Sequence, residues 1–171
     1  MIRQLLRDAH GIAQAEYKDT SPRSVGRAML LDAFPIIALT RIREMCRQYR
    51  IPAINRTLRL VQMALYGIEI GKNVEIGDGV SFVHSLGTVV GGTSRVGNRV
   101  RFMGNNTIGT AKDNGCPVIE DDVVVGCGAR VLGPIRVGAG AFIGANSVVI
   151  HDVPPGAIVA GAPARVLSRP R

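Results

Sequence analysis

Apolar residues recur at every sixth position along most of this chain, with two longer gaps. The run reads Ile70, Ile76, Phe82, Val90, Val96, Phe102, Ile108, Ile119, Val125, Val131, Val137, Ile143 and Val149. This period fits neither the helical repeat of about 3.6 residues nor the alternation of an ordinary strand. It is typical of a coil of very short strands joined by tight corners. Because three repeats make one triangular turn, the run predicts about four turns of a parallel β-helix.

A second row of inward side chains is expected four residues after the first. Its members are Val74, Val80, Leu86, Val123, Ala129, Ile135, Ala141 and Ser147. Several are small, because this side chain must fit beside an aliphatic one. Glycine often follows the aliphatic residue, as in Ile70-Gly71 and Val125-Gly126, where it relieves crowding at a corner. A sandwich of ordinary strands would instead show a period of two.

The first part of the chain lacks the six-residue period. Residues 1–66 carry apolar side chains at intervals of three and four, which predicts three helices. Ser21-Pro22 interrupts this pattern, Pro35 is a candidate kink, and Pro52 suits the first turn of the last helix. The sequence therefore predicts a helical segment over 1–66, a β-helix over 67–153 with a loop at 109–118, and a C-terminal tail over 154–171.

Basic residues are concentrated in the helical segment. The chain has a net charge of +8, and residues 1–66 contain eleven Arg or Lys against five acids. Such a surface attracts nucleic acid, anionic lipid or a phosphorylated substrate, or it is simply a solvated basic face. Aromatic residues make up only 4% of the chain and no RNA-binding motif is present, so nucleic acid is not an expected partner.

The cysteines and the apolar runs indicate a cytoplasmic protein. The chain has three cysteines, Cys46, Cys116 and Cys127. Their odd number and the lack of CxxC spacing indicate a reducing compartment. The N-terminus has no apolar core of a signal peptide, and no apolar run is long enough to span a membrane.

The two gaps in the period mark the candidate functional segments. A β-helix gains stability by continuing its repeat, so an interruption indicates a further requirement. The spacing from Phe82 to Val90 is eight positions instead of six, and His84 lies between them. The spacing from Ile108 to Ile119 is eleven positions, so the chain between these two must form a projecting loop.

His84 is the candidate general base. It follows an inward residue by two positions, so it should point outward near a corner, and histidine is the side chain best suited to proton transfer near neutral pH. Glu69 is the first candidate to orient it, being fifteen residues earlier where a full turn is about eighteen. The alternative is a surface histidine without a chemical role.

Together these residues resemble the serine acetyltransferase group of the left-handed β-helix (hexapeptide) acyltransferases. The likeness rests on the repeats, on Gly67-Ile68-Glu69-Ile70 leading to His84, on Thr107 to Thr110, and on Val153 to Arg165. It implies a mainly β fold, a left-handed parallel β-helix with a short N-terminal α-helical segment. It also implies a homotrimer that binds acetyl-CoA in the groove between adjacent subunits.

The resemblance also assigns roles to residues. His84 matches the family histidine that deprotonates the acceptor hydroxyl, and Glu69 matches an aspartate that orients it. The expected coenzyme A contacts are Gly109, Thr110, Gly126, Cys127, Gly128, Ala145, Asn146, Ala160, Gly161 and Arg165. The N–H groups around Gly109 and Thr110 are candidates to stabilise the oxyanion. Arg165 is the charged group suited to a phosphate.

Two positions depart from the serine acetyltransferase pattern. Val83 replaces the aspartate that holds the serine amine, and Gly115-Cys116-Pro117 replaces an Arg-His-Pro that grips its carboxylate. Val83 and Cys116 are therefore expected walls of a site for a neutral acceptor. This pattern resembles the O-acetyltransferases of exopolysaccharide assembly, of the colanic acid type. The basic helices would then suit a lipid-linked glycan or the inner face of the cytoplasmic membrane.

The sequence thus predicts an acetyl-CoA-dependent O-acetyltransferase that acts on a sugar hydroxyl of an exopolysaccharide or glycan. One alternative is a serine O-acetyltransferase of cysteine biosynthesis, and another is a non-catalytic β-helix scaffold. No metal is expected. The β-helical carbonic anhydrases need three zinc histidines, whereas this coil has only His84 and His151.

Overall fold

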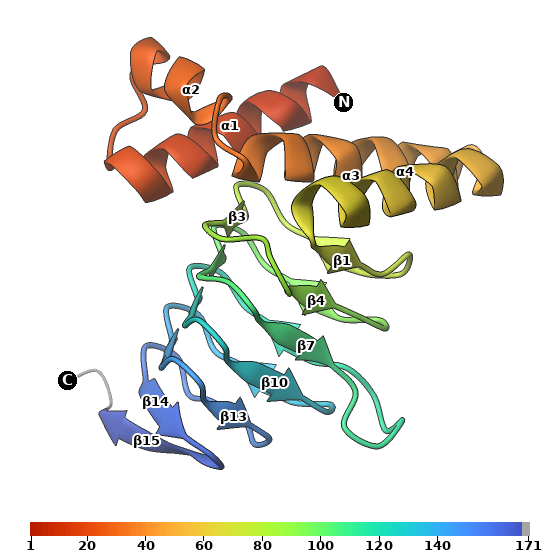
Figure 1. The fold of residues 1–171 in the computed structure, drawn as a ribbon. Helices are drawn as coiled ribbons and strands as arrows, with labels where there is room; N and C mark the ends of the chain where they lie inside the picture. The colour runs from red at the N-terminus through yellow and green to blue at the C-terminus, as the bar shows by residue number, and fades with distance from the viewer. Residues whose placement is uncertain (169–171) are drawn as a thin grey trace.

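The computed structural model describes residues 1–168, in which four helices lie across one end of a three-sided coil of strands (Figure 1). The helices are α1 (Ile2–Tyr17), α2 (Pro22–Ala28), α3 (Ala33–Gln48) and α4 (Pro52–Tyr66). Three helices were predicted, but Ser21-Pro22 begins a separate short helix, which Ser21 caps by accepting from the Ser24 N–H. Pro35 falls in the first turn of α3, where its missing N–H costs no helical hydrogen bond. Pro52 begins α4, as predicted.

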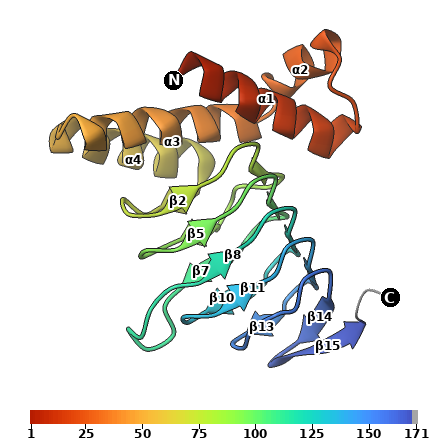
Figure 2. The ribbon, with the colours of Figure 1, turned by 180° about the vertical axis from the view of Figure 1, so that it is seen from behind.

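The coil consists of short parallel strands on three faces. Face A holds β1 (Glu69–Ile70), β4 (Val89–Val90), β7 (Thr107–Gly109), β10 (Arg130–Leu132) and β13 (Val148–Val149). Face B, seen in Figure 2, holds β2 (Glu75–Ile76), β5 (Arg95–Val96), β8 (Val118–Ile119) and β11 (Arg136–Val137). Face C holds β3 (Ser81–Phe82), β6 (Arg101–Phe102), β9 (Val124–Val125), β12 (Phe142–Ile143), β14 (Ile158–Gly161) and β15 (Ala164–Ser168). The corners between faces are called the A–B, B–C and C–A corners.

The register of the strands places the predicted rows one above another. On face A, Ile70 pairs with Val90 and Val90 with Ile108. On face C, Phe82 lies over Phe102 with ring centroids 5.1 Å apart. These rows form one buried core, and the predicted left-handed parallel β-helix is confirmed.

The coil has about five turns, although the repeats predicted about four. The last turn does not continue the six-residue pattern and was therefore not predicted. In this turn, Val153 makes only an isolated bridge to Val137, and Val159 of β14 pairs with Ile143. Residues 154–168 are the described part of the predicted tail. Within it, β14 extends face C in parallel and β15 runs antiparallel to β14 at the edge.

The prediction that Leu86 points inward is wrong. Its side chain is 73% exposed, whereas Thr88 is fully buried and takes the inward position. The longer gap after Phe82 adds two residues to this corner, so the second inward row moves on by two.

Arginines of α3 close the first turn of the coil. First-turn N–H groups donate to the second turn, as Gly71 N–H does to the Val90 carbonyl at 2.8 Å, so first-turn carbonyls face the helices. Arg41 donates to the carbonyls of Ile76 at 2.8 Å and Gly77 at 2.7 Å. Arg43 and Arg47 donate in the same way to Ile70 and Lys72. An open strand edge would leave these acceptors unpaired, and the arginines satisfy them.

A buried ion pair holds the principal arginine in place. Asp8 of α1 is fully buried and accepts from Arg41 Nε at 3.0 Å and Nη2 at 3.1 Å. Asp8 also accepts from the Gly79 N–H at 2.9 Å, so one carboxylate joins α1, α3 and the coil. Burial by itself lowers the pKa of Arg41, but the hydrogen bonds that it donates to Asp8 and the charges of Asp8 and Glu44 raise it overall.

Candidate active site

The C–A corners of successive turns stack into one continuous edge of the coil. The Gly128 N–H donates to the Gly104 carbonyl at 2.9 Å, and the Asn146 N–H donates to the Cys127 carbonyl at 2.8 Å. The Asn105 N–H reaches the Leu86 carbonyl at 3.2 Å, which links the edge to the corner that contains His84. His84 therefore lies at the end of this edge nearest the helices.

The His84 side chain is exposed, as predicted, at the corner between β3 and β4. The next corner passes close beneath it: a Cβ added to Gly104 would lie 2.8 Å from the His84 Cβ. Gly104 also has a φ of 125°, which disfavours any residue with a side chain. The backbone thus approaches His84 in a way that only glycine permits.

Glu69 begins β1 beside the chain that leaves the His84 corner. Its N–H donates to the Thr88 carbonyl at 2.9 Å, and it is paired in register with Val89. Its carboxylate accepts a hydrogen bond from Arg59 Nη2 of α4 at 2.5 Å. Within residues 1–168, no hydrogen bond is recorded between this carboxylate and the His84 ring.

Most of the expected coenzyme A contacts lie on the C–A edge below His84. Those on the edge are Gly126, Cys127, Gly128, Ala145, Asn146, Ala160 and Gly161. They pack closely: a Cβ on Gly126 would lie 2.6 Å from the Ala145 nitrogen, and one on Gly144 would lie 2.8 Å from the Ala160 Cβ. Gly126 is buried, but most of the other residues on this edge are exposed or half-buried. Such a row of small residues suits an extended ligand that binds peptide groups.

The other predicted residues lie away from this edge. Gly109 ends β7 at an A–B corner, and the loop that starts at Thr110 projects there from the coil (Figure 1). Cys116 of this loop packs on the A–B corner of the preceding turn, where a Cβ on Gly92 would overlap its Sγ. Val83, by contrast, is next to His84. One chain therefore does not bring Val83 and Cys116 together.

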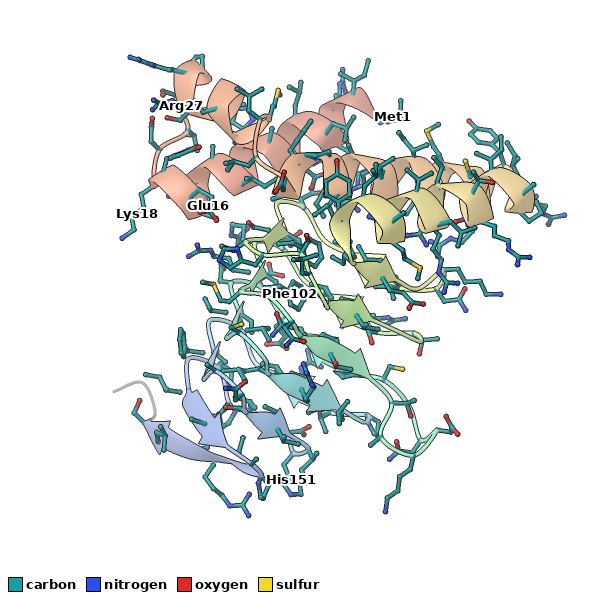
Figure 3. All side chains as sticks on the ribbon, viewed as in Figure 1. Met1, Glu16, Lys18, Arg27, Phe102 and His151 are labelled. Atoms are coloured by element: carbon teal, nitrogen blue, oxygen red, sulfur yellow. The ribbon has the colours of Figure 1, made fainter. Side chains whose placement is uncertain are left out.

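Arg165 and His151 lie toward the opposite end of the coil from the helices. Arg165 is exposed on β15 and pairs in register with Ala160, so it flanks the far end of the C–A edge. Figure 3 shows His151 at this end, with Phe102 inside the coil. Within residues 1–168, no three His, Cys, Asp or Glu side chains are grouped as a metal site would require.

Two further residues organise the C–A edge and were not singled out from the sequence. Asn106 is fully buried; its Nδ2 donates to the Gly126 carbonyl at 2.7 Å and its Oδ1 accepts from the Gly104 N–H at 3.0 Å. Arg130 donates to the Asn105 carbonyl. The sequence did contain a signal for Asn106, because it is a polar residue at the inward position four residues after Phe102.

The sequence comparisons identify transferases of the same repeat. The family "Bacterial transferase hexapeptide (six repeats)" matches residues 116–151. A serine acetyltransferase of Synechococcus elongatus is 38% identical over 139 residues, which are 80% of this chain and 57% of the relative. One of Bacillus subtilis is 44% identical over 115 residues, which are 66% of this chain and 53% of the relative. The chain thus spans a little over half the length of these relatives.

Solved structures have the same fold. The serine acetyltransferase of Neisseria gonorrhoeae matches with a TM-score of 0.86 and 29% identity, covering 98% of this chain and 67% of that one. Soybean serine acetyltransferase matches with a TM-score of 0.82.

The expected closeness to exopolysaccharide O-acetyltransferases is not supported by these comparisons, because the relatives described above are named serine acetyltransferases. None of the four helices among the described residues has the length and apolar character needed to cross a membrane. With 33% identity to the soybean enzyme across 96% of this chain and 69% of that one, the chain belongs to the hexapeptide-repeat acyltransferases, in the group of the serine acetyltransferases.

Proposed function

We propose that this protein is an acetyl-CoA-dependent O-acetyltransferase with His84 as its general base. The observation that carries the proposal is the C–A edge, which has an exposed histidine at one end and a row of mostly small, largely exposed residues below it. Coenzyme A is a long, thin molecule, so it can extend along this row with its thioester at His84. Arg165 at the far end then suits the phosphates of the nucleotide.

The proposed reaction is a direct transfer between two bound substrates. His84 accepts the proton of the acceptor hydroxyl while the oxygen attacks the thioester carbonyl. The tetrahedral intermediate then collapses and the carbon–sulfur bond breaks. The imidazolium donates its proton to the leaving thiolate, which restores the neutral base. Holding both substrates at the edge removes much of the entropic barrier. Peptide N–H groups beside the thioester stabilise the negative charge on its oxygen.

We infer that the active unit is a homotrimer, because the proposed site is incomplete in one chain. Val83 and His84 lie on the C–A edge, whereas Gly109, Thr110 and Cys116 lie at A–B corners. A second copy that places its loop against the C–A edge of the first completes the set, and repetition around a threefold axis closes the ring. Light scattering should therefore give the mass of three chains. A monomer that retains full activity would contradict the assembly.

Serine is the first candidate acceptor, because the relatives named above are serine acetyltransferases. A neutral hydroxyl, such as that of a sugar on a nucleotide or lipid-linked glycan, is the second. It is favoured by Val83 and Cys116, whose side chains offer serine neither a carboxylate nor a cation. A cytoplasmic location, and contact of the basic helices with the membrane, remain predictions from the sequence.

The substitution Val83→Asp separates the two acceptors. If serine is the acceptor, we expect a carboxylate beside His84 to bind its ammonium group and raise kcat/KM for serine about tenfold, the value of one charge-assisted hydrogen bond. Thiol release from acetyl-CoA measures the rate with serine and with a panel of nucleotide sugars. Leu86→Asp is the matched control, since Leu86 is exposed on the same corner.

Wild-type turnover decides the order of the candidates. If wild-type protein acetylates a sugar efficiently and serine negligibly, and Val83→Asp lowers the rate with the sugar, the second candidate replaces the first. If no hydroxyl compound accelerates thiol release, the enzymatic proposal fails and the scaffold interpretation stands.

A further inference from the structure

The ion pair between Arg59 and Glu69 connects α4 to the corner that contains His84. The bond from Arg59 Nη2 to Glu69 Oε1 is 2.5 Å long. We propose that Arg59 is a positioning residue: it binds one oxygen of the Glu69 carboxylate and thereby fixes the orientation of the other toward His84. This inference rests on the proposed function, in which His84 is the base.

The end of α4, Glu69 and the His84 corner form one packed unit. Only Gly67 and Ile68 separate α4 from β1, and Ile68 is fully buried. The Gly67 carbonyl accepts from the Gly87 N–H at 2.9 Å, and a Cβ on Gly67 would lie 2.6 Å from Leu86 Cδ2. The segment that carries Glu69 is therefore packed directly against Leu86 and Gly87, which follow His84 in the chain.

Buried polar contacts fix the position of α4 and hence of Arg59. Gln62 is the buried residue of this helix, and its Nε2 donates to the Ile36 carbonyl at 2.9 Å and to Thr40 Oγ1 at 3.0 Å. Its Oε1 accepts from Arg43 Nη1 at 2.6 Å, and Arg43 also binds the Ile70 carbonyl. Because the three hydrogen bonds of Gln62 would be lost if α4 moved along its axis, Arg59 has a defined place beside Glu69.

The charges around Glu69 come from two helices. Arg59 lies on α4, while Arg43 and Glu44 lie on α3; the strand neighbour, Val89, is uncharged. Burial lowers the pKa of Arg43, and the positive charge of Arg59 lowers it further, so the two guanidinium groups influence one another. Arg59 is thus the cation that directly neutralises the carboxylate expected to face the imidazole.

Removal of this cation should change the pH dependence of the reaction. Without Arg59, Glu69 is a less compensated negative charge near His84, and it stabilises the imidazolium over the neutral base. More of the enzyme is then protonated at a given pH, so the acid limb of the rate profile moves to higher pH. A purely structural role for Arg59 would lower activity without moving this limb.

The test compares Arg59→Met, Arg59→Lys and Arg56→Met in the full-length protein. For Arg59→Met we expect kcat to fall about three- to tenfold with KM for acetyl-CoA nearly unchanged, and the acid limb to rise by about half a pH unit, as for loss of one partly screened charge. Arg59→Lys keeps the charge and should restore the position of the limb. Arg56 is exposed on the same helix and has no ion pair within residues 1–168, so its variant should match wild type.

A double variant tests whether Arg59 acts through Glu69. In a Glu69→Gln background, Arg59→Met should cause no further loss, because the carboxylate it holds is gone. Additive losses of activity, or an unchanged acid limb in Arg59→Met, would overturn the proposed role of Arg59. His84→Ala tests the proposed function independently of this result. Thermal unfolding monitors the fold. If Arg59→Met does not fold, Arg59→Gln, which keeps a hydrogen-bond donor without the charge, replaces it in the same comparison.

Discussion

Replacing His84 with alanine should lower turnover by about a hundredfold or more, the usual scale for loss of a general base. His84 is the exposed imidazole at the end of the C–A edge, and the backbone of Gly104 passes directly beneath it. The substitution removes the proton acceptor and leaves the small residues of the edge unchanged. Acetyl-CoA should therefore still bind, so that kcat falls while the dissociation constant measured by calorimetry stays close to wild type.

A histidine elsewhere on the coil is the control for this experiment. His151 is exposed at the end remote from the helices, and His151→Ala should leave turnover unchanged (Figure 3). Mixed trimers add a second readout: His84→Ala chains combined with inactive chains altered in the loop 110–117 should recover activity if one site draws on both. Wild-type turnover by the His84 variant would show that His84 is not the general base.

Replacing Asp8 with alanine should destabilise the protein by about 3–5 kcal/mol, the usual cost of removing one partner of a buried ion pair. Arg41 is only 4% exposed and would remain buried without its carboxylate, while the Gly79 N–H would lose its acceptor. Since Arg41 binds carbonyls of the first turn, the loss falls where the helices meet the coil. Urea unfolding measures the change in the free energy of unfolding.

The neighbouring surface pair provides the control. Arg7 and Asp78 join the same two parts of the protein, but the Arg7 side chain is 59% exposed. Solvent screens such a pair, so Arg7→Ala should cost less than about 1 kcal/mol. Equal effects of Asp8→Ala and Arg7→Ala would show that the buried pair contributes no more than the exposed one.

The sequence alone predicted the features that depend on local spacing. The six-residue period reflects the steric demands of each short strand and corner, so it identified the inward aliphatic row from Ile70 to Val149. The same spacing predicted that His84 is exposed, because it follows the inward residue Phe82 by two positions near a corner. Pro52 was correctly expected to begin a helix, since its missing N–H is harmless there.

The tertiary structure decided everything that depends on how turns stack and how the helices dock. The alignment of His84 with Gly126 and Asn146 on one edge depends on the number of residues in every intervening turn, including both interruptions. The number of residues in each turn also places Cys116 at a different corner from Val83. The partners of Asp8 and Arg59 lie on other elements, and charged side chains at helical spacing do not indicate whether they face solvent or a strand edge. A local period specifies which residues point inward, but only the completed coil, with its unpaired first-turn carbonyls, specifies which arginines are buried to bind them.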